Sequence, residues 1–366
     1  MKFTIIRSRL LDAVKTVQNI VAGKASVQIL QNVRVVAEDG RLELTTTDLT
    51  ITVKHSVECS VDVPGKTTIP VRLLFLTMSK AAEGPVTIET GDDNLSVISA
   101  GSAVFKIAGL PEKEYPQTVA EDDSFCYTIP QSTLREMLRK THYAATQEEQ
   151  RRNIQGVLMS FRAGKLTMVA TDGRRLALVD NEVEIPAGGE RDVTIPNRSI
   201  TELMRILEAG DGKEAKIYLR NTQAYFDLGE TGFSTKILSD PYPDYKPVIP
   251  GSLAEHAEID RQLLIEALER TSVMFFAKKN AAHLVFADNQ LIVSSNSSDL
   301  GEARDIIPIK FSGSRIEVCV DPVFLIEPLK AIDDNEVTIE LNDGISPFVL
   351  KCGIPFIYVL MPLRIM

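Results

Sequence analysis

The tripeptide Gly65-Lys66-Thr67 comes nearest in this chain to a known chemical motif, because it matches the end of a phosphate-binding P-loop. That loop needs another glycine five residues before Gly65, and the residue there is Ser60. Pro64-Gly65 is therefore interpreted as a turn. The glycine patterns of dinucleotide sites and of the hydrolase nucleophile elbow do not occur in the sequence.

Carboxylates, thiols and imidazoles that might act together are scattered along the chain. Asp48 and Asp172 end two similar segments, where use in a turn is a better interpretation than catalysis. The 4 cysteines and 4 histidines form neither a C-x-x-C nor an H-x-x-x-H pair. We therefore expect a non-catalytic protein that needs no metal and no cofactor.

Composition places the chain among globular proteins with two or three domains. It has 366 residues, of which 44% are hydrophobic and 25% charged. No stretch approaches the roughly 18 consecutive apolar residues of a membrane span, and the N-terminus does not resemble a secretory signal. The sequence predicts a cytoplasmic protein without membrane contact.

The formal net charge of −10 argues against a broad basic surface that grips nucleic acid. A negative net charge is still compatible with positive charge that is confined to an inner surface. Charge alone therefore leaves nucleic-acid binding open.

Internal repeats determine the expected architecture. Four landmarks recur three times in the same order: a strand before an amphipathic helix, a strand ending in a polar turn, a short strand before a second helix, and a hairpin. The second landmark covers residues 41–48, 165–172 and 290–297, at shifts of 124 and 125 residues. The second helices carry start signals, a capping box at Ser199-x-x-Glu202 and the pair Asp321-Pro322.

These repeats predict an α+β fold of three modules, each with two helices packed on antiparallel sheet. The modules are expected at residues 1–120, 121–252 and 253–366. Polar or proline-rich segments separate them.

Several segments resemble the bacterial DNA polymerase III beta subunit, the sliding clamp or processivity factor. They are the start Met1-Lys2-Phe3-Thr4, residues 170–177 (ATDGRRLA), Tyr242-Pro243-Asp244-Tyr245, and residues 359–364 (VLMPLR). The resemblance covers the whole chain. It implies the DNA clamp fold, with the three modules forming half of a closed ring and a head-to-tail homodimer completing it.

The resemblance also implies the function. A ring-shaped homodimer would encircle double-stranded DNA without regard to sequence. It would tether the replicative polymerase subunit, the clamp loader, repair polymerases, ligase and mismatch-repair proteins for DNA replication and repair.

Two sets of contact residues follow from the family pattern and the helix faces. The dimer interface would pair Phe105 and Ile107 with Val273 and Met274. A weak positive lining would face DNA, although each residue by itself also fits a solvated helix face. The lining set is Lys15, Lys24, Arg72, Lys80, Arg135, Arg139, Arg151, Arg152, Arg198 and Arg205.

The C-terminal residues 354–366 are almost wholly apolar, which is unusual for a chain end. Pro362 should end the last strand and leave Met361, Leu363 and Ile365 on the surface. In the family, this tail and the junction of the second and third modules form a groove for short peptide motifs. The implied lining is Ile154, Thr171, Gly173, Arg174, Arg175, Leu176, Pro243, Val248, Ile345, Val359, Leu360, Met361, Pro362, Leu363 and Arg364.

Two alternatives remain open at this level. A small-molecule enzyme on a repeated α+β scaffold would need converging titratable groups, and the sequence offers none. A clamp-like regulator that does not encircle DNA is supported only by the acidic stretch Gln147-Glu148-Glu149.

Overall fold

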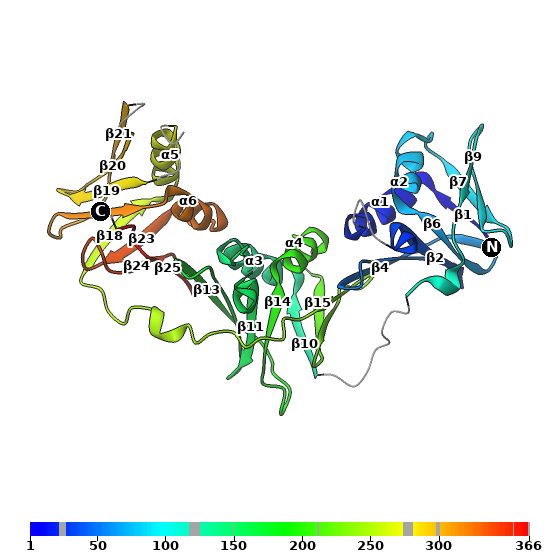
Figure 1. The fold of residues 1–366 in the computed structure, drawn as a ribbon, viewed down its shortest axis with the longest axis horizontal. Coiled ribbons are helices and arrows are strands. Elements are labelled where there is room, and N and C mark those ends of the chain that lie inside the picture. Colours follow the sequence, from blue (N-terminus) through cyan, green and yellow to red (C-terminus); the bar gives the residue numbers. More distant parts are fainter. Residues whose placement is uncertain are drawn as a thin grey trace. The chain divides into compact units, whose positions relative to one another are not determined.

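The computed structural model describes residues 1–21, 27–116, 125–148, 150–210, 212–273, 281–297, 301–353 and 355–364. Lys24 and Met274, both assigned to contact sets above, lie outside these residues, as does Ile365. The described residues form 6 α-helices and 25 strands, and the same element order recurs three times (Figure 1). The predicted repetition of two helices with antiparallel strands is confirmed.

The first repeat holds eleven of these elements. They are β1 (Lys2–Ile6), α1 (Arg7–Val17), β2 (Asn32–Glu38), β3 (Arg41–Thr47), β4 (Ile51–Glu58), β5 (Ser60–Val63), β6 (Gly65–Pro70), α2 (Val71–Lys80), β7 (Pro85–Thr90), β8 (Leu95–Ala100) and β9 (Ala103–Ala108).

The second repeat follows the same order without a counterpart of β5. It comprises β10 (Phe125–Pro130), α3 (Gln131–Thr141), β11 (Gly156–Arg162), β12 (Lys165–Thr171), β13 (Arg175–Glu182), β14 (Arg191–Pro196), α4 (Asn197–Ile206), β15 (Glu214–Leu219), β16 (Gln223–Asp227) and β17 (Thr231–Lys236).

The third repeat matches the second element for element. Its members are β18 (Glu255–Asp260), α5 (Arg261–Ser272), β19 (Ala282–Ala287), β20 (Gln290–Ser297), β21 (Gly301–Pro308), β22 (Ile316–Val320), α6 (Pro322–Ala331), β23 (Glu336–Leu341), β24 (Phe348–Lys351) and β25 (Phe356–Leu360).

The chain divides into two compact units that do not follow the repeat boundaries. The first unit is Met1–Arg135 with Thr201–Ile237, and the second is Glu136–Ile200 with Leu238–Met366. The first holds a 5-stranded sheet, β5-β1-β7-β8-β9, and an 8-stranded sheet, β10-β15-β16-β17-β4-β3-β2-β6. The second holds an 8-stranded sheet, β14-β11-β12-β13-β25-β24-β23-β18, and a 4-stranded sheet, β21-β20-β19-β22.

Each 8-stranded sheet joins two successive repeats by pairing two edge strands. In the first unit, β4 pairs antiparallel with β17, with Ile51 opposite Thr235. In the second unit, β13 pairs antiparallel with β25, with Arg175 opposite Leu360. Ile51 and Arg175 are each the first residue of their strand. The residue after each partner donates to the residue before the strand, Lys236 to Thr50 at 3.0 Å and Met361 to Arg174 at 2.9 Å, so the two joints repeat one register. Pairing satisfies backbone groups that an exposed edge would leave open.

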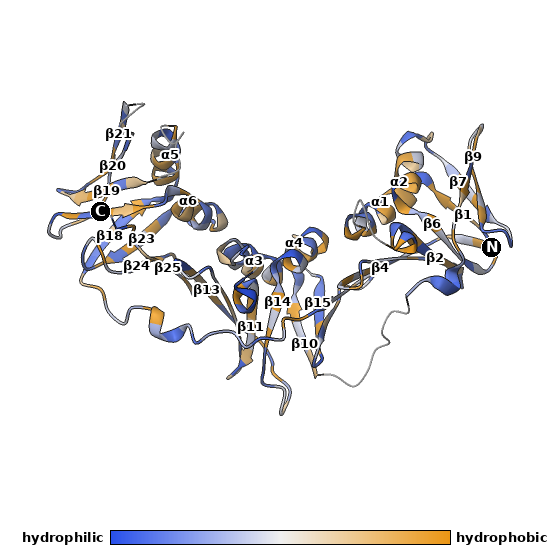
Figure 2. Ribbon diagram, in the orientation of Figure 1, coloured by the Kyte–Doolittle hydropathy of each residue, from blue (hydrophilic) through white to orange (hydrophobic). Residues whose placement is uncertain are grey.

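Helix start signals and buried stripes explain the local structure. Leu10, Leu11, Val14 and Val17 form the buried face of α1, which packs against α2. In Figure 2, most of α2 has the hydrophobic colour, in agreement with its sequence VRLLFLTMSK. Within the described residues, every helix is too short or too polar to cross a lipid bilayer.

The predicted helix caps had different outcomes. Asp321 accepts a hydrogen bond from the backbone N–H of Val323 at 3.0 Å, as expected for the N-cap of α6. The capping box at Ser199 was wrong, because α4 begins at Asn197 and Ser199 lies inside the helix with 1% of its surface exposed.

Phe233 on β17 gives a test of the first joint. It is fully buried, faces Val53 of β4, and its ring centroid lies 6.0 Å from that of Phe226. Phe233→Ala should lower the free energy of unfolding by about 3–5 kcal/mol, because it leaves a cavity in a packed core. Urea titration followed by circular dichroism measures the change. Ser234→Ala, on the opposite face of the same strand, is the control, and equal unfolding midpoints for both variants would contradict this packing.

Candidate functional site

A cavity of about 190 Å³ opens in the second unit where β12 and β13 meet the end of β25. Its floor consists of buried apolar side chains, including Leu176 and Val359, each 1% exposed. Its rim is exposed, with Val248 at 47% and Met361 at 40%. The full lining is Ile154, Thr171, Gly173, Arg174, Arg175, Leu176, Pro243, Asp244, Tyr245, Val248, Val359 and Met361. An apolar floor with a partly polar rim suits a short apolar peptide segment.

Ten residues of the predicted groove lining therefore meet in one cavity, and two were missed. Asp244 and Tyr245 belong to the lining although only Pro243 and Val248 had been chosen from that loop. The signal was present, since both lie in the Tyr-Pro-Asp-Tyr segment that carried the resemblance. In the described structure the lining does not include Ile345, Leu360, Pro362, Leu363 or Arg364.

The C-terminal tail runs past the cavity as an anchored surface segment. β25 ends at Leu360, so the expected strand end before Pro362 is confirmed. The backbone N–H of Met361 donates to the carbonyl of Arg174 at 2.9 Å, and that of Leu363 donates to Cys319 at 2.7 Å. Met361 is exposed as expected, whereas Leu363 is half-buried. Ile345 lies on a separate loop and is 72% exposed.

One turn shapes the mouth of the cavity. The Thr171 hydroxyl donates to the carbonyl of Arg175 at 2.5 Å, and Asp172 accepts from the backbone N–H of Arg174 at 2.9 Å. Gly173 has φ +87°, a backbone region that favours glycine. Thr47 and Asp48 make the corresponding turn before β4. The turn interpretation of Asp48 and Asp172 is thus confirmed.

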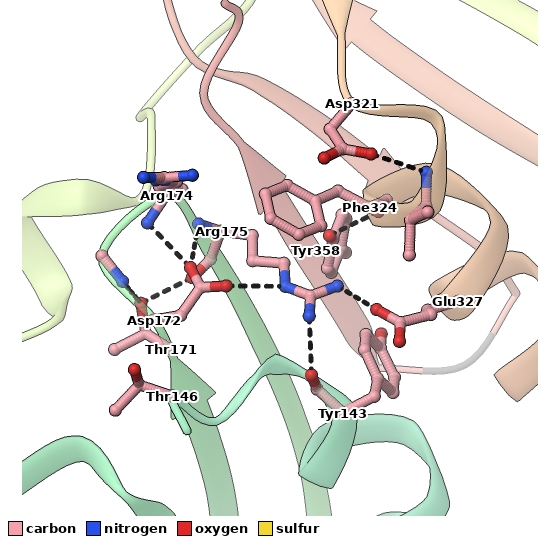
Figure 3. Close-up of polar contacts among 12 residues, drawn as sticks. Tyr143, Thr146, Thr171, Asp172, Arg174, Arg175, Asp321, Phe324, Glu327 and Tyr358 are labelled. Atoms are coloured by element: carbon pink, nitrogen blue, oxygen red, sulfur yellow. Dashed lines mark hydrogen bonds and ion pairs between the residues drawn. The ribbon is translucent and has the colours of Figure 1, made fainter. Parts of the chain in front are cut away.

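Arg175 is the most heavily engaged charge near the cavity (Figure 3). Its Nε donates to Asp172 at 3.0 Å, its Nη2 to the carbonyl of Tyr143 at 2.7 Å, and its Nη1 to Glu327. Its Cζ atom lies 4.2 Å from the ring centroid of Phe324. Burial opposes the charged form, but the hydrogen bond to Glu327 and the nearby Glu327 and Asp172 carboxylates raise the pKa of Arg175, so it stays protonated.

Three buried or partly buried tyrosines, Tyr143, Tyr242 and Tyr358, pack near Arg175 and the cavity floor. Tyr358 is fully buried, and its hydroxyl donates to the carbonyl of Phe324 at 2.5 Å. Burial raises the pKa values of Tyr143, Tyr242 and Tyr358, so all three stay neutral at physiological pH. The neutral Tyr358 hydroxyl can therefore donate its hydrogen bond to Phe324, and all three rings act as packing groups.

The basic residues predicted to face DNA are on or near helices, but several are paired with acids of the same chain. Lys15 on α1 contacts Asp12 at 3.0 Å, and Arg205 on α4 contacts Glu202 at 3.5 Å. Arg139 on α3 is ion-paired with Asp333, and a hydrogen bond from Arg139 lowers the pKa of Asp333. Such pairing weakens the field that a nearby phosphate would feel.

The remaining basic candidates have varied surroundings. Arg72 and Lys80 on α2, Arg198 on α4 and the loop residue Arg152 are exposed, and Arg135 is half-buried. Arg151 donates to the carbonyl of Asp172 at 2.8 Å, which places it beside Gly173 of the cavity. That contact ties Arg151 to the groove, whatever its relation to DNA.

Three residues of the predicted interface, Phe105, Ile107 and Val273, lie within the described part of the chain. Phe105 and Ile107 are on β9, the edge strand of the 5-stranded sheet. Phe105 is half-buried, whereas Ile107 is 3% exposed and belongs to the chain's own core. Val273 directly follows α5 and is 62% exposed. The described residues contain no cluster of three or more His, Cys, Asp or Glu side chains suited to a metal.

Sequence profiles of the DNA polymerase III beta subunit match nearly the whole chain. The N-terminal domain profile matches residues 1–119, the central domain profile 128–244 and the C-terminal domain profile 246–364.

Known proteins and structures agree with the profiles. The beta sliding clamp of Pseudomonas aeruginosa is 30% identical over 369 residues, covering 100% of both chains. The crystal structure of the Bacillus subtilis DNA polymerase sliding clamp has a TM-score of 0.95 at 25% identity, with 100% of both chains covered. A Pseudomonas aeruginosa clamp bound to griselimycin has a TM-score of 0.95 at 29% identity, also over 100% of both chains.

The chain belongs to the DNA polymerase III beta subunit family, the bacterial beta sliding clamps. It is a DNA sliding clamp, a non-catalytic processivity factor of DNA replication. The expected three-module clamp fold is thereby confirmed.

Proposed function

We propose that two copies of this chain close head to tail into a ring around duplex DNA. The observation that carries the proposal is the joint between successive repeats, which occurs twice with one register. The strands that correspond to β4 and β17 at a third joint are β21 and β9. Both are outermost strands of their sheets. A second copy of the chain supplies the missing partner for each.

The two joints within the chain give the register of the third. Ile51, the first residue of β4, faces Thr235, which is one residue from the end of β17. Thr235 and Leu360, the partners at the two joints, each lie three residues before a leucine whose backbone N–H donates to the strand preceding the second helix, Leu238 to Thr194 and Leu363 to Cys319. Leu110 donates to Thr68 at the same place in the first repeat, so the equivalent partner is Ile107, and Gly301, the first residue of β21, should face Ile107 of the other copy. Antiparallel pairing then sets Lys106 opposite Glu302 and Val104 opposite Arg304.

The side chains on these two strands suit such an interface. Val104 is 59% exposed on β9 and Ile306 is 47% exposed on β21. Exposed apolar residues on an unpaired edge favour association. The opposite charges of Lys106 and Glu302 add a favourable cross-strand pair. Because β9 meets β21 rather than a second β9, the interface is head to tail, and two such interfaces close a ring.

Enclosure, rather than adhesion, would hold the protein on DNA. Lys15, Arg139 and Arg205 already pair with acids of their own chain, and the net charge is −10. A lining of this kind offers phosphate contacts that are weak and independent of sequence. Lys24, Arg72, Lys80, Arg135, Arg151, Arg152 and Arg198 complete the proposed lining.

The cavity in the second unit is proposed as the common docking groove for partner proteins. Its apolar floor and exposed Met361 suit short peptide segments of the polymerase, the clamp loader and repair proteins. Griselimycin is bound in the structure of a related clamp, and we propose that it binds this groove, which makes it the probe for the tests below. The proposed module boundaries remain 1–120, 121–252 and 253–366, and the proposed location is the cytoplasm.

Disulfide cross-linking tests the register of the third joint. The double variant Val104→Cys with Arg304→Cys should form a covalent dimer under mild oxidation, because paired antiparallel residues lie within disulfide reach. Non-reducing electrophoresis measures the dimer fraction against the unmodified chain, which keeps its own 4 cysteines.

The matched control combines Val104→Cys with Asp305→Cys. A slip of one residue turns the second thiol to the opposite face of the sheet, so this pair should cross-link far less. Equal yields for both pairs, or a monomer in sedimentation velocity, would rule out the proposed interface.

Topological retention on DNA tests the ring. After loading onto nicked circular DNA by a bacterial clamp loader with ATP, the protein should stay bound in 0.5 M salt, where the Debye length is roughly 4 Å and phosphate contacts are screened. Linearising the DNA should then release it, because the ring slides off free ends. Gel filtration of the DNA fraction measures retention. Loss in salt from circular DNA would favour the alternative, a clamp-like regulator that does not encircle DNA.

Truncation tests the groove. A chain ending at Met361 lacks the hydrogen bond from Leu363 to Cys319 that holds the tail beside the cavity. Griselimycin affinity, measured by isothermal titration calorimetry, should fall roughly tenfold, equivalent to about 1.4 kcal/mol. The thermal midpoint and the dimer in sedimentation velocity should not change. An unaltered griselimycin affinity would show that residues 362–366 do not contribute to binding in the groove.

A further inference from the structure

Arg175 is an unusual residue for its place in the fold. Its counterpart at the first joint is Ile51, which is fully buried, and the preceding turn is the same in both. Arg175 is itself only 8% exposed. The backbone at this position therefore does not require a charge. A buried guanidinium costs free energy unless it is fully paired, and an apolar side chain of similar size often serves stability as well or better.

The pairing of Arg175 connects three separate parts of the second unit. Asp172 belongs to the turn before β13, and the Tyr143 carbonyl follows α3. Glu327 and Phe324 are one turn apart on α6. Figure 3 shows the guanidinium between these groups, with dashed lines to Asp172, Tyr143 and Glu327.

Arg175 also connects α6 with the cavity through its side chain. Arg175 and Leu176 both line the cavity, at the start of β13. Within the described structure, no residue of α6 is among the lining residues. A shift of α6 would therefore be transmitted to the cavity wall through the Arg175–Glu327 ion pair. The guanidinium donors of Arg175 are engaged by Asp172, Tyr143 and Glu327, so its charge is already paired within the protein.

We propose that Arg175 is a positioning residue, which sets the shape of the docking groove by anchoring the start of β13 to Glu327 of α6. The inference rests on the proposed docking function of the groove. It differs from a purely structural role, for which the isoleucine of the first joint would suffice. It also differs from direct recognition of an acidic ligand group, because the pair with Glu327 neutralises the guanidinium.

A double-mutant cycle on the full-length chain tests this assignment. The variants are Arg175→Met, Glu327→Leu and the combination of both, with griselimycin as the probe ligand in isothermal titration calorimetry. Each single variant should bind about tenfold more weakly, because the contact that anchors the start of β13 to α6 is lost and the groove wall shifts. The double variant should bind no more weakly than Arg175→Met alone, since both residues act through one contact.

Stability gives the readout that separates positioning from structure. Each single variant should melt at a lower temperature than the parent chain, whereas the double variant should recover only part of the loss, because it removes the unpaired Glu327 charge but leaves Asp172 without its partner. Its griselimycin affinity should not recover. Glu327→Gln, which keeps the shape and a hydrogen-bond acceptor, should melt close to the parent and still bind more weakly. It provides the test if a larger change prevents folding.

The control is Arg162→Met, which breaks an exposed ion pair with Asp192 at 2.7 Å in the same unit. It should change neither griselimycin affinity nor the melting temperature appreciably. Parent-like affinity of the double variant would overturn the positioning role while leaving the docking groove intact. Failure of the parent chain itself to bind griselimycin would overturn both the groove and this inference.

Discussion

The whole structure depends on the pairing of edge strands between successive repeats. An unpaired edge exposes a row of backbone N–H and C=O groups, and antiparallel addition of a neighbour satisfies them. The chain solves this twice, through β4 with β17 and through β13 with β25. Each joint makes one 8-stranded sheet from two repeats. The compact units consequently cross the repeat boundaries, because hydrogen bonding between repeats is as continuous as hydrogen bonding within them.

The two joints share a backbone but differ in what they leave open. At the first, Tyr115 is 5% exposed, clusters with Ile29 and Leu30, and donates to the carbonyl of Thr45 at 3.0 Å. At the second, the corresponding Tyr242 is only half-buried against the apolar cluster that forms the cavity floor. The side chains on one repeated scaffold thus decide where a groove exists. A duplicated architecture acquires a specialised site by changing a few residues.

The partial neutralisation of basic helix residues suits a protein that moves along DNA. Helix residues that would attract phosphate are in part neutralised by acids from the same chain, as for Lys15 with Asp12 and Arg139 with Asp333. Strong direct contacts would hold the protein at one place and make binding steeply dependent on salt. The buried Arg175 serves a different purpose, because its charge is paired with Asp172 and Glu327 of its own chain.

The sequence by itself determined the repeats, the family and most of the cavity. Apolar periodicity and the constant shifts between segments are local properties, and they predicted the helices, the Asp172 turn and the strand end before Pro362. Ten lining residues followed from segments that match the family. The prediction of an N-cap at Ser199 was wrong, because the helix already begins at Asn197 and the Ser199 side chain is buried inside it.

Only the tertiary structure decided which edges pair, which charges are neutralised and which tail residues reach the cavity. Asp333 is far from Arg139 in the sequence, and Glu327 is far from Arg175. No local sequence pattern predicts either of these two ion pairs. Leu363 is drawn toward Cys319 by a backbone hydrogen bond that no side-chain pattern encodes. Long-range pairing arises from the packing of whole sheets, whereas sequence periodicity reports only which face of an element is apolar.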